Sequence, residues 1–181
     1  MGAFWERVDL FDARVDEAWA QAFRGKPAVD KLFYLASELG DFSLIWHVVG
    51  VAQGLRSDED ADAALRMGVI LLTESLLVNQ GLKRLVHRPR PVHTAVRPHR
   101  LRTPSTSSFP SGHASSAFTA AGVLSHRDPK AAPLYYGLAA VVATSRIHVR
   151  IHHASDVIVG AAVGIALARV ANRVWPMPRT A

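Results

Sequence analysis

The sequence predicts an all-α protein, a helical transmembrane bundle of about five spans with an amphipathic helix at its N-terminus. Of the 181 residues, 49% are hydrophobic, and they gather in separate segments. Polar or proline-rich stretches divide these segments, and short polar motifs lie at their ends, as expected of helices packed side by side. The apolar segments are residues 30–55, 64–82, 113–125, 132–145 and 157–168.

The chain is long enough for one domain with a sizeable core, and it contains no internal repeat. The absence of cysteine excludes disulfides and thiolate metal sites. The net charge is +6, and much of the positive charge falls between Lys83 and Arg102. A local basic stretch indicates an anionic substrate, nucleic acid or anionic membrane surface as the partner. The acidic residues between Met1 and Lys26 argue against a cleavable signal peptide.

Residues 3–24 have the periodicity of an amphipathic helix. Apolar residues recur every three or four positions, at Phe4, Val8, Phe11, Val15 and Trp19. The acidic residues occupy the remaining surface, at Asp9, Asp12, Asp16 and Glu17. Two interpretations stay open: a surface helix packed on the domain, or a helix in a membrane interface with Trp5 and Trp19 as anchors.

The second apolar segment, residues 30–55, is interrupted by the polar residues 38–41. It is either one span with a kink or a short helix leading into a span. Residues 56–63 are acidic and predict a solvated loop, and residues 64–82 predict the next helix. Three polar residues lie inside this helix: Glu74, Asn79 and Gln80.

Residues 91–110 are rich in proline, arginine, serine and threonine and predict a loop. Residues 113–125 predict a helix of small residues, and a polar turn follows at 126–130. Two further helices, residues 132–145 and 157–168, are rich in alanine, valine and glycine. Small residues in the last helix suit close packing. The tail is basic, with Arg169, Arg173 and Arg179.

Three polar motifs stand out. They are Lys83 with Arg90-Pro91, then Pro110-Ser111-Gly112-His113, then Ser145-Arg146 with His152 and Asp156. No apolar run reaches the roughly 20 uninterrupted residues of a clear membrane span, so a soluble helical protein is the alternative. However, if the helices from residue 64 onward cross a bilayer in turn, all three motifs reach the same face. This coincidence favours a membrane bundle.

The third motif predicts an oriented histidine. His152 and Asp156 are four residues apart and would share a face of a helix. A carboxylate there can accept a hydrogen bond from one imidazole nitrogen and leave the other as a nucleophile. The structural alternative is an acidic residue and a histidine that only stabilise a helix start.

The second motif predicts an anion site at a helix start. Free backbone N–H groups there favour an anion, Gly112 permits close approach, and Ser111 adds a hydroxyl. His113 could protonate a leaving oxygen. The structural alternative is an ordinary N-capped helix.

The first motif supplies two cations. Pro89 and Pro91 end the helix, so that Arg90 can fold back towards Lys83. Arginine suits a forked contact with phosphate, and lysine acts as a point charge. A basic cluster attracted to anionic lipid is the structural alternative.

In this order and spacing, the three motifs resemble the signature of the phosphatidic acid phosphatase type 2 and vanadium haloperoxidase superfamily, over roughly residues 64–170. The resemblance implies a helical membrane bundle and metal-independent hydrolysis of a phosphate ester, with no cofactor. It also implies one domain, residues 1–181, in which 1–27 form the N-terminal helix and 64–170 the catalytic core. In the lipid phosphatases of this family the bundle usually has six spans, so we expect the first span to be missing here or replaced by the amphipathic helix.

The resemblance implies a role for each motif residue. His152 matches the nucleophile that forms a phosphohistidine, Asp156 its orienting carboxylate, and His113 the acid for the leaving group. The phosphate-binding residues implied are Lys83, Arg90, Ser111, Gly112 and Arg146.

Two local departures from the family pattern indicate a more basic mouth to the site. His148 and Arg150 replace an aromatic residue and a glycine, and Arg88-Pro89 duplicates the Arg-Pro pair. We therefore expect Arg150, His148 and Arg88 to line the substrate mouth. Arg97 and Arg100 would add to it, and together these side chains hint at a second anionic group on the substrate.

Four other interpretations compete with this one. Zinc could bind His148, His152, His153 and Asp156, although arginines would then face a cation. The basic loop could bind nucleic acid, but it lacks interleaved aromatic residues, so no nucleic-acid partner is expected. The same pocket could hold vanadate, as in a haloperoxidase. The alternative to an enzyme is a non-catalytic basic membrane scaffold.

The expected partners are a lipid phosphate substrate and membrane lipids; the sequence makes no prediction of oligomeric state. A polyprenyl phosphate or diphosphate is favoured, and a phospholipid phosphate is next. The expected location is the cell membrane, with several spans. The basic tail after Asp156 predicts a cytoplasmic C-terminus and an active site on the outer face.

Overall fold

The computed structural model describes residues 2–92 and 101–179, and these form helices and no strand, which confirms the all-α class. In chain order the elements are α1 Gly2–Phe23, α2 Pro27–Leu39, the 3₁₀ turn η1 Asp41–Ser43, α3 Leu44–Gly54, α4 Asp58–Ser75, the π-helical turns η2 Leu76–Leu82, α5 Lys83–Leu85, α6 Gly112–Arg127, the 3₁₀ turn η3 Pro129–Ala131, α7 Ala132–His148 and α8 Ala154–Val174.

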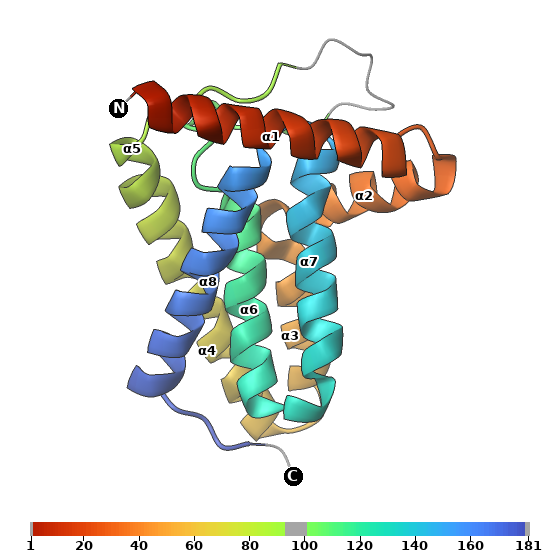
Figure 1. The fold of residues 1–181 in the computed structure, drawn as a ribbon. Helices are drawn as coiled ribbons and strands as arrows, with labels where there is room; N and C mark the ends of the chain where they lie inside the picture. Colours follow the sequence, from red (N-terminus) through yellow and green to blue (C-terminus); the bar gives the residue numbers. More distant parts are fainter. Residues whose placement is uncertain (1, 93–100, 180–181) are drawn as a thin grey trace.

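The helices form an upright bundle with a cap across one end (Figure 1). The bundle consists of α3, α4 with its continuation through η2 and α5, and then α6, α7 and α8. Helix α1 lies across the end at which α7 and α8 are joined, and α2 lies beside it. The C-terminus lies at the opposite end (Figure 1).

Helix α6 is the centre of the bundle and packs on α8, α7 and α4. Its buried residues are mostly alanine, serine, threonine and glycine, which let neighbouring backbones approach closely. Gly160 and Gly164 of α8 face it: a β-carbon on either would collide with the carbonyl oxygen of Ser111 or Ser115. The close α6–α8 contact therefore depends on these two glycines, which are four residues apart.

The outer surface of the bundle is apolar. Leu65, Leu72 and Leu76 on α4 and η2, and Ile158 and Val170 on α8, are all more than half exposed. Water-soluble proteins rarely expose so large an apolar surface. Among the described residues, α8 is the single helix with the length and hydropathy to cross a membrane by itself. The expected number of about five spans therefore stays a prediction.

The predicted acidic loop at residues 56–63 is wrong beyond Ser57, because α4 begins at Asp58. The Ser57 side chain accepts a hydrogen bond from the Asp60 N–H at 3.1 Å, as an N-cap does. Acidic residues in a first turn also interact favourably with the helix dipole. The acidic run is thus a helix start.

The segment at residues 30–55 forms two helices, α2 and α3, which favours the interpretation of a short helix leading into a bundle helix. The chain turns between them at Phe42 and Ser43, whose φ angles are 53° and 59°. Helices α7 and α8 are longer than predicted. Helix α8 begins only at Ala154, with His153 as its N-cap, so the prediction that His152 and Asp156 share a face of one helix is wrong.

The amphipathic pattern of α1 only partly decides which side of the helix faces the bundle. Phe4 and Phe11 are exposed, as in the interpretation of a helix that contacts a membrane interface, while Asp12 is buried. Asp12 and Asp16 face the protein because arginines pair with them there: Arg88 with Asp12 at 2.7 Å and Arg150 with Asp16 at 3.1 Å.

Candidate active site

The three motifs converge at the capped end of the bundle. A cavity of about 610 Å³ opens there, and its lining includes members of all three. The expected site residues in the lining are Lys83, Gly112, His113, Arg146 and His152. The cavity also contains polar residues that motif spacing did not single out for a role: His47, Glu74, Asn79 and Arg102. The fold thus brings together residues that are more than 100 positions apart in the sequence, such as His47 and His152.

His152 is buried and oriented by a contact at each ring nitrogen. Its Nε2 lies 3.1 Å from Arg90 Nη1, and its Nδ1 lies 3.6 Å from Asp156 Oδ2. An arginine can only donate, so Nε2 must be the acceptor and the ring proton belongs on Nδ1, facing the carboxylate. In this tautomer Nε2 carries no proton, and its lone pair accepts the hydrogen bond from Arg90.

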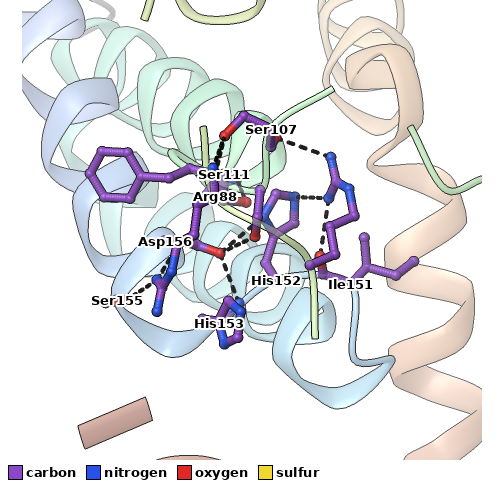
Figure 2. Close-up of polar contacts among 12 residues, drawn as sticks. Arg88, Ser107, Ser111, Ile151, His152, His153, Ser155 and Asp156 are labelled. Carbon is purple, nitrogen blue, oxygen red and sulfur yellow. Dashed lines mark hydrogen bonds and ion pairs between the residues drawn. The ribbon is translucent and has the colours of Figure 1, made fainter. Parts of the chain in front are cut away.

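Asp156 is held rigidly beside the histidine (Figure 2). Its Oδ2 accepts hydrogen bonds from the Ser108 hydroxyl and from the His153 N–H, the latter at 2.9 Å. Its Oδ1 accepts one from Arg88 Nη1 at 2.8 Å. Because the side chain turns back to cap α8, it reaches the turn that carries His152.

The surroundings of His152 keep its ring neutral. Burial, together with the charges of Arg146 and Arg90, lowers its pKa to about 3, although Asp156 acts in the opposite direction. A neutral imidazole with one unprotonated nitrogen is the form required of a nucleophile.

The start of α6 lies next to the lysine of the first motif. Ser111 is the N-cap, and its hydroxyl accepts a hydrogen bond from the Ala114 N–H at 3.4 Å. A β-carbon at Gly112 would lie 3.2 Å from Asn79 Oδ1 and 3.8 Å from Lys83 Nζ. The capped helix and the anion site expected there are therefore compatible, because Gly112 leaves space between the helix start and the lysine.

His113 contacts residues that were not assigned to the site from the sequence. Its Nε2 lies 3.1 Å from the Ser37 carbonyl oxygen and 3.2 Å from Asp41 Oδ1. Both are acceptors, so Nε2 carries a proton. Burial opposes ionisation of Asp41, but His113 and the charges of Arg146 and Arg102 lower its pKa overall. The Ser37 hydroxyl accepts a hydrogen bond from Arg146 Nη1.

These contacts come from the last turns of α2, which hold Ser37, and from η1, which holds Asp41. In the sequence, the polar break at residues 38–41 predicts either a kink or a boundary between two helices, but it does not predict a contact with His113. Gly40 is required there, because a β-carbon would come within 2.6 Å of His113 Cδ2.

Arg90 folds over His152 and joins it to the preceding loop. Besides the contact with His152, its guanidinium donates to the carbonyl oxygens of Ile151 at 3.0 Å, Pro104 at 3.1 Å and Thr106 at 3.1 Å. The predicted helix end before Pro89 is observed, as α5 ends at Leu85.

The three residues expected at the mouth contact α1 and α2 instead of lining the cavity. Arg88 is buried against acidic residues of α1, and Arg150 pairs with Asp16. His148 accepts a hydrogen bond from Trp19 Nε1 at 3.2 Å and lies 2.9 Å from Asp30 Oδ1. Arg97 and Arg100 lie outside the described residues. A further cation in the lining, besides Lys83 and Arg146, is Arg102, which also stacks over Phe42 at 4.4 Å.

The ligands of the alternative zinc site do not converge. His148 faces Asp30, whereas His152 faces Asp156 and His153 lies 3.3 Å from the Pro89 carbonyl oxygen. Among residues 2–92 and 101–179, no cluster of three or more metal-ligating side chains is present.

The family of this protein is identified by a match over more than half of the chain. A family model of the PAP2 superfamily matches residues 63–179, which include every motif described above. The chain belongs to the PAP2 superfamily. This confirms the resemblance that the motif spacing indicated.

Similar curated proteins include two from mycobacteria. Decaprenylphosphoryl-5-phosphoribose phosphatase of Mycobacterium tuberculosis is 43% identical over 93 residues, which are 51% of this chain and 51% of that protein. The chain thus matches about half the length of that relative. The corresponding protein of Mycolicibacterium smegmatis is 32% identical over 141 residues, 77% of this chain and 75% of its own length.

Solved PAP2 structures share the fold. The transmembrane PAP2 type phosphatidylglycerolphosphate phosphatase of Bacillus subtilis superimposes with a TM-score of 0.70 at 24% identity, covering 93% of this chain and 86% of that one. LpxE of Aquifex aeolicus gives a TM-score of 0.67 at 25% identity, covering 87% of this chain and 93% of its own.

Proposed function

We propose that this PAP2 protein is an integral-membrane phosphatase that hydrolyses a lipid phosphate through a phosphohistidine on His152. The observation that carries the proposal is the placement of His152. Its Nε2 accepts from Arg90, its Nδ1 lies 3.6 Å from Asp156 Oδ2, and its ring lines the cavity that the three motifs share. Such an arrangement is that of an activated nucleophile with its orienting carboxylate.

In the first step, Nε2 of His152 attacks phosphorus as the bond to the leaving oxygen breaks. Lys83, Arg146 and the N–H groups at the start of α6 stabilise the charge on the equatorial oxygens. Arg90 transfers its Nη1 hydrogen bond from Nε2 to a phosphate oxygen. Once the phosphate dianion is bound, its negative charge acts together with Asp41 to favour protonated His113, which gives its proton to the leaving oxygen.

In the second step, water attacks the phosphohistidine. Neutral His113 accepts the proton of that water, the bond between phosphorus and Nε2 breaks, and inorganic phosphate leaves. His152 returns to its starting state and His113 is again protonated. All the charge that the transfer requires is supplied by Lys83, Arg90 and Arg146, so we propose a reaction that needs no metal.

For the substrate, we propose a polyprenyl lipid whose phosphate is followed by a second polar or anionic group. The names of the mycobacterial relatives support a polyprenyl-linked sugar phosphate. Arg102 supports the second anionic group, because it lies in the cavity with Lys83 and Arg146. It replaces, in this proposal, the basic mouth that the sequence suggested. The apolar exterior of the bundle supports delivery of the lipid from the bilayer.

The experiment is a phosphate-release assay of the purified protein in detergent, with a panel of lipid phosphates. The panel contains a polyprenyl phosphate, a polyprenyl diphosphate, a polyprenyl-linked sugar phosphate and phosphatidylglycerophosphate. His152→Ala should reduce turnover to background, and Asp156→Asn should reduce it by about 10²- to 10⁴-fold, as for other carboxylates that orient a catalytic histidine. Full activity of His152→Ala would refute the assignment and leave the scaffold interpretation.

The same assay tests the need for metal. Activity should persist in excess EDTA, and vanadate should inhibit as a phosphate mimic. Loss of activity in EDTA, with recovery on adding back one metal ion, would contradict the proposed chemistry.

A further inference from the structure

The buried guanidinium of Arg88 joins the N-terminal helix to the site. Its Nη1 donates hydrogen bonds to Asp156 Oδ1 at 2.8 Å and to the Ser155 hydroxyl at 2.7 Å. Its Nη2 donates to Asp12 Oδ2 at 2.7 Å and to Asp9 Oδ1 at 2.8 Å. One side chain thus bridges the carboxylate beside His152 and two carboxylates of α1.

Asp12 also contacts the first turn of α8 directly. Its Oδ1 accepts a hydrogen bond from the Ser155 N–H at 2.7 Å, and its Oδ2 accepts one from the Ser155 hydroxyl at 2.6 Å. The carboxylate is only 4% exposed. It therefore fixes α1 to the helix start on which Asp156 lies, and a carboxylate is favoured at that position by the helix dipole.

The charges explain why an acidic residue is needed at position 12. A buried arginine paired with Asp156 alone would neutralise that carboxylate and compete with His152 for it. With Asp12 and Asp9 on the other edge of the guanidinium, the positive charge is shared among three carboxylates. Asp156 then keeps enough negative charge to attract the N–H group at Nδ1 of His152.

The geometry is also specific to Arg88. Its planar fork directs one nitrogen at Asp156 and the other at Asp12, so that neither carboxylate can rotate without losing a hydrogen bond. Because Oδ1 of Asp156 is held in this way, its Oδ2 stays directed at Nδ1 of His152.

We propose that Asp12, on the N-terminal helix, is a positioning residue of the reaction, which acts on His152 through Arg88 and Asp156. Helix α1 is accordingly part of the catalytic apparatus and not only a cap on the bundle. This inference rests on the proposed phosphatase function.

The test compares Asp12→Asn with Asp16→Asn. Asp16 lies one turn further along α1 and also ties the helix to the bundle, through Arg24 and Arg150, but it has no contact with Arg88. Asp12→Asn should lower kcat by about 10- to 100-fold, because Arg88 loses a charged partner and holds Asp156 less firmly, with KM almost unchanged. Asp16→Asn should keep kcat within about twofold.

A second measurement does not depend on turnover. In protein labelled with ¹⁵N-histidine, the ring signals of His152 are those that disappear in His152→Ala. The wild-type signals should report a neutral ring protonated at Nδ1, and Asp12→Asn should shift them, whereas Asp16→Asn should not. If the wild type hydrolyses nothing, the proposed function fails, and these signals still decide the role of Asp12.

The remaining outcomes are also decisive. Wild-type kcat and unshifted His152 signals in folded Asp12→Asn would overturn the inference, as would an equal loss of kcat in Asp16→Asn. If Asp12→Asn does not fold, Arg88→Lys replaces it, since lysine keeps the charge but cannot bridge both carboxylates. Lowered kcat with shifted His152 signals in Arg88→Lys would support the inference, and wild-type behaviour would contradict it.

Discussion

His152 illustrates how single residues acquire their chemistry in this protein. The spacing to Asp156 predicted the pair, yet the contact arises because Asp156 turns back from α8 to a residue in the preceding turn. The tautomer depends on a third residue, Arg90, which can only donate to Nε2. The burial that these contacts require also lowers the pKa of His152.

This lowered pKa predicts a dependence of stability on pH. An unfolded histidine has a pKa of about 6.5, whereas that of folded His152 is about 3. The unfolded state therefore binds the proton first, and stability falls as the pH drops from about 6.5 towards 3. Between pH 6.5 and pH 5 the loss should be about 2 kcal/mol.

Thermal unfolding in detergent at several pH values measures this effect. His152→Asn lacks the titrating group, so the difference in melting temperature between wild type and variant should move in favour of the variant at low pH. A difference that stays constant from pH 7 to pH 5 would show that His152 has an ordinary pKa.

At the scale of elements, the α6–α8 contact sets the position of the phosphate-binding helix start. Gly160 touches the Ser111 carbonyl and Gly164 the Ser115 carbonyl, so the two backbones are in direct contact. The Thr119 hydroxyl adds a hydrogen bond to the Gly164 carbonyl oxygen at 3.2 Å. The sequence indicated small residues in α8, but only the packing shows which of them touch α6.

Gly164→Ala should therefore destabilise the protein, by about 1–3 kcal/mol, because the new methyl group meets backbone atoms that cannot rotate away. Gly137→Ala in α7 is the matched control, since nothing lies within 4 Å of its β-carbon position. Alanine favours a helix over glycine, so the control should be as stable as wild type or more so. Equal melting temperatures for the two variants would contradict the close contact.

At the scale of the whole molecule, the site and α1 lie at one end of the bundle and the C-terminus at the other (Figure 1). Two basic residues of the tail, Arg169 and Arg173, lie in the last two turns of α8. Positive residues next to a span favour the cytoplasmic side. We therefore propose that the C-terminus is cytoplasmic and that the site opens on the outer face.

A reporter fused after Ala181 tests this orientation. A fusion that is active only in the cytoplasm should give signal, and one that is active only outside the membrane should not. The reverse pattern would place the site on the cytoplasmic face. A second fusion in the α6–α7 turn, after Lys130, is expected to agree with the first, because that turn also lies at the end of the bundle opposite α1.

The sequence by itself determined the helical class, the order of the main helices and the residues of the three motifs. It could do so because helix periodicity, proline and glycine act locally, and because the motif spacing is specific in combination. Where a local signal was ambiguous, as in the acidic run after Ser57, the interpretation failed.

Only the tertiary structure decided which residues meet. Asp41 and Ser37 reach His113, and Arg102 reaches the cavity. Asp12 reaches Arg88 from α1, although the amphipathic pattern of that helix predicted only that its acidic residues lie away from its apolar stripe. Arg88, Arg150 and His148, which were expected at the mouth, bind α1 and α2 instead. The physical reason is that burying a charge is costly unless an opposite charge or a hydrogen-bond partner contacts it, and the partners of these residues lie far away in the sequence.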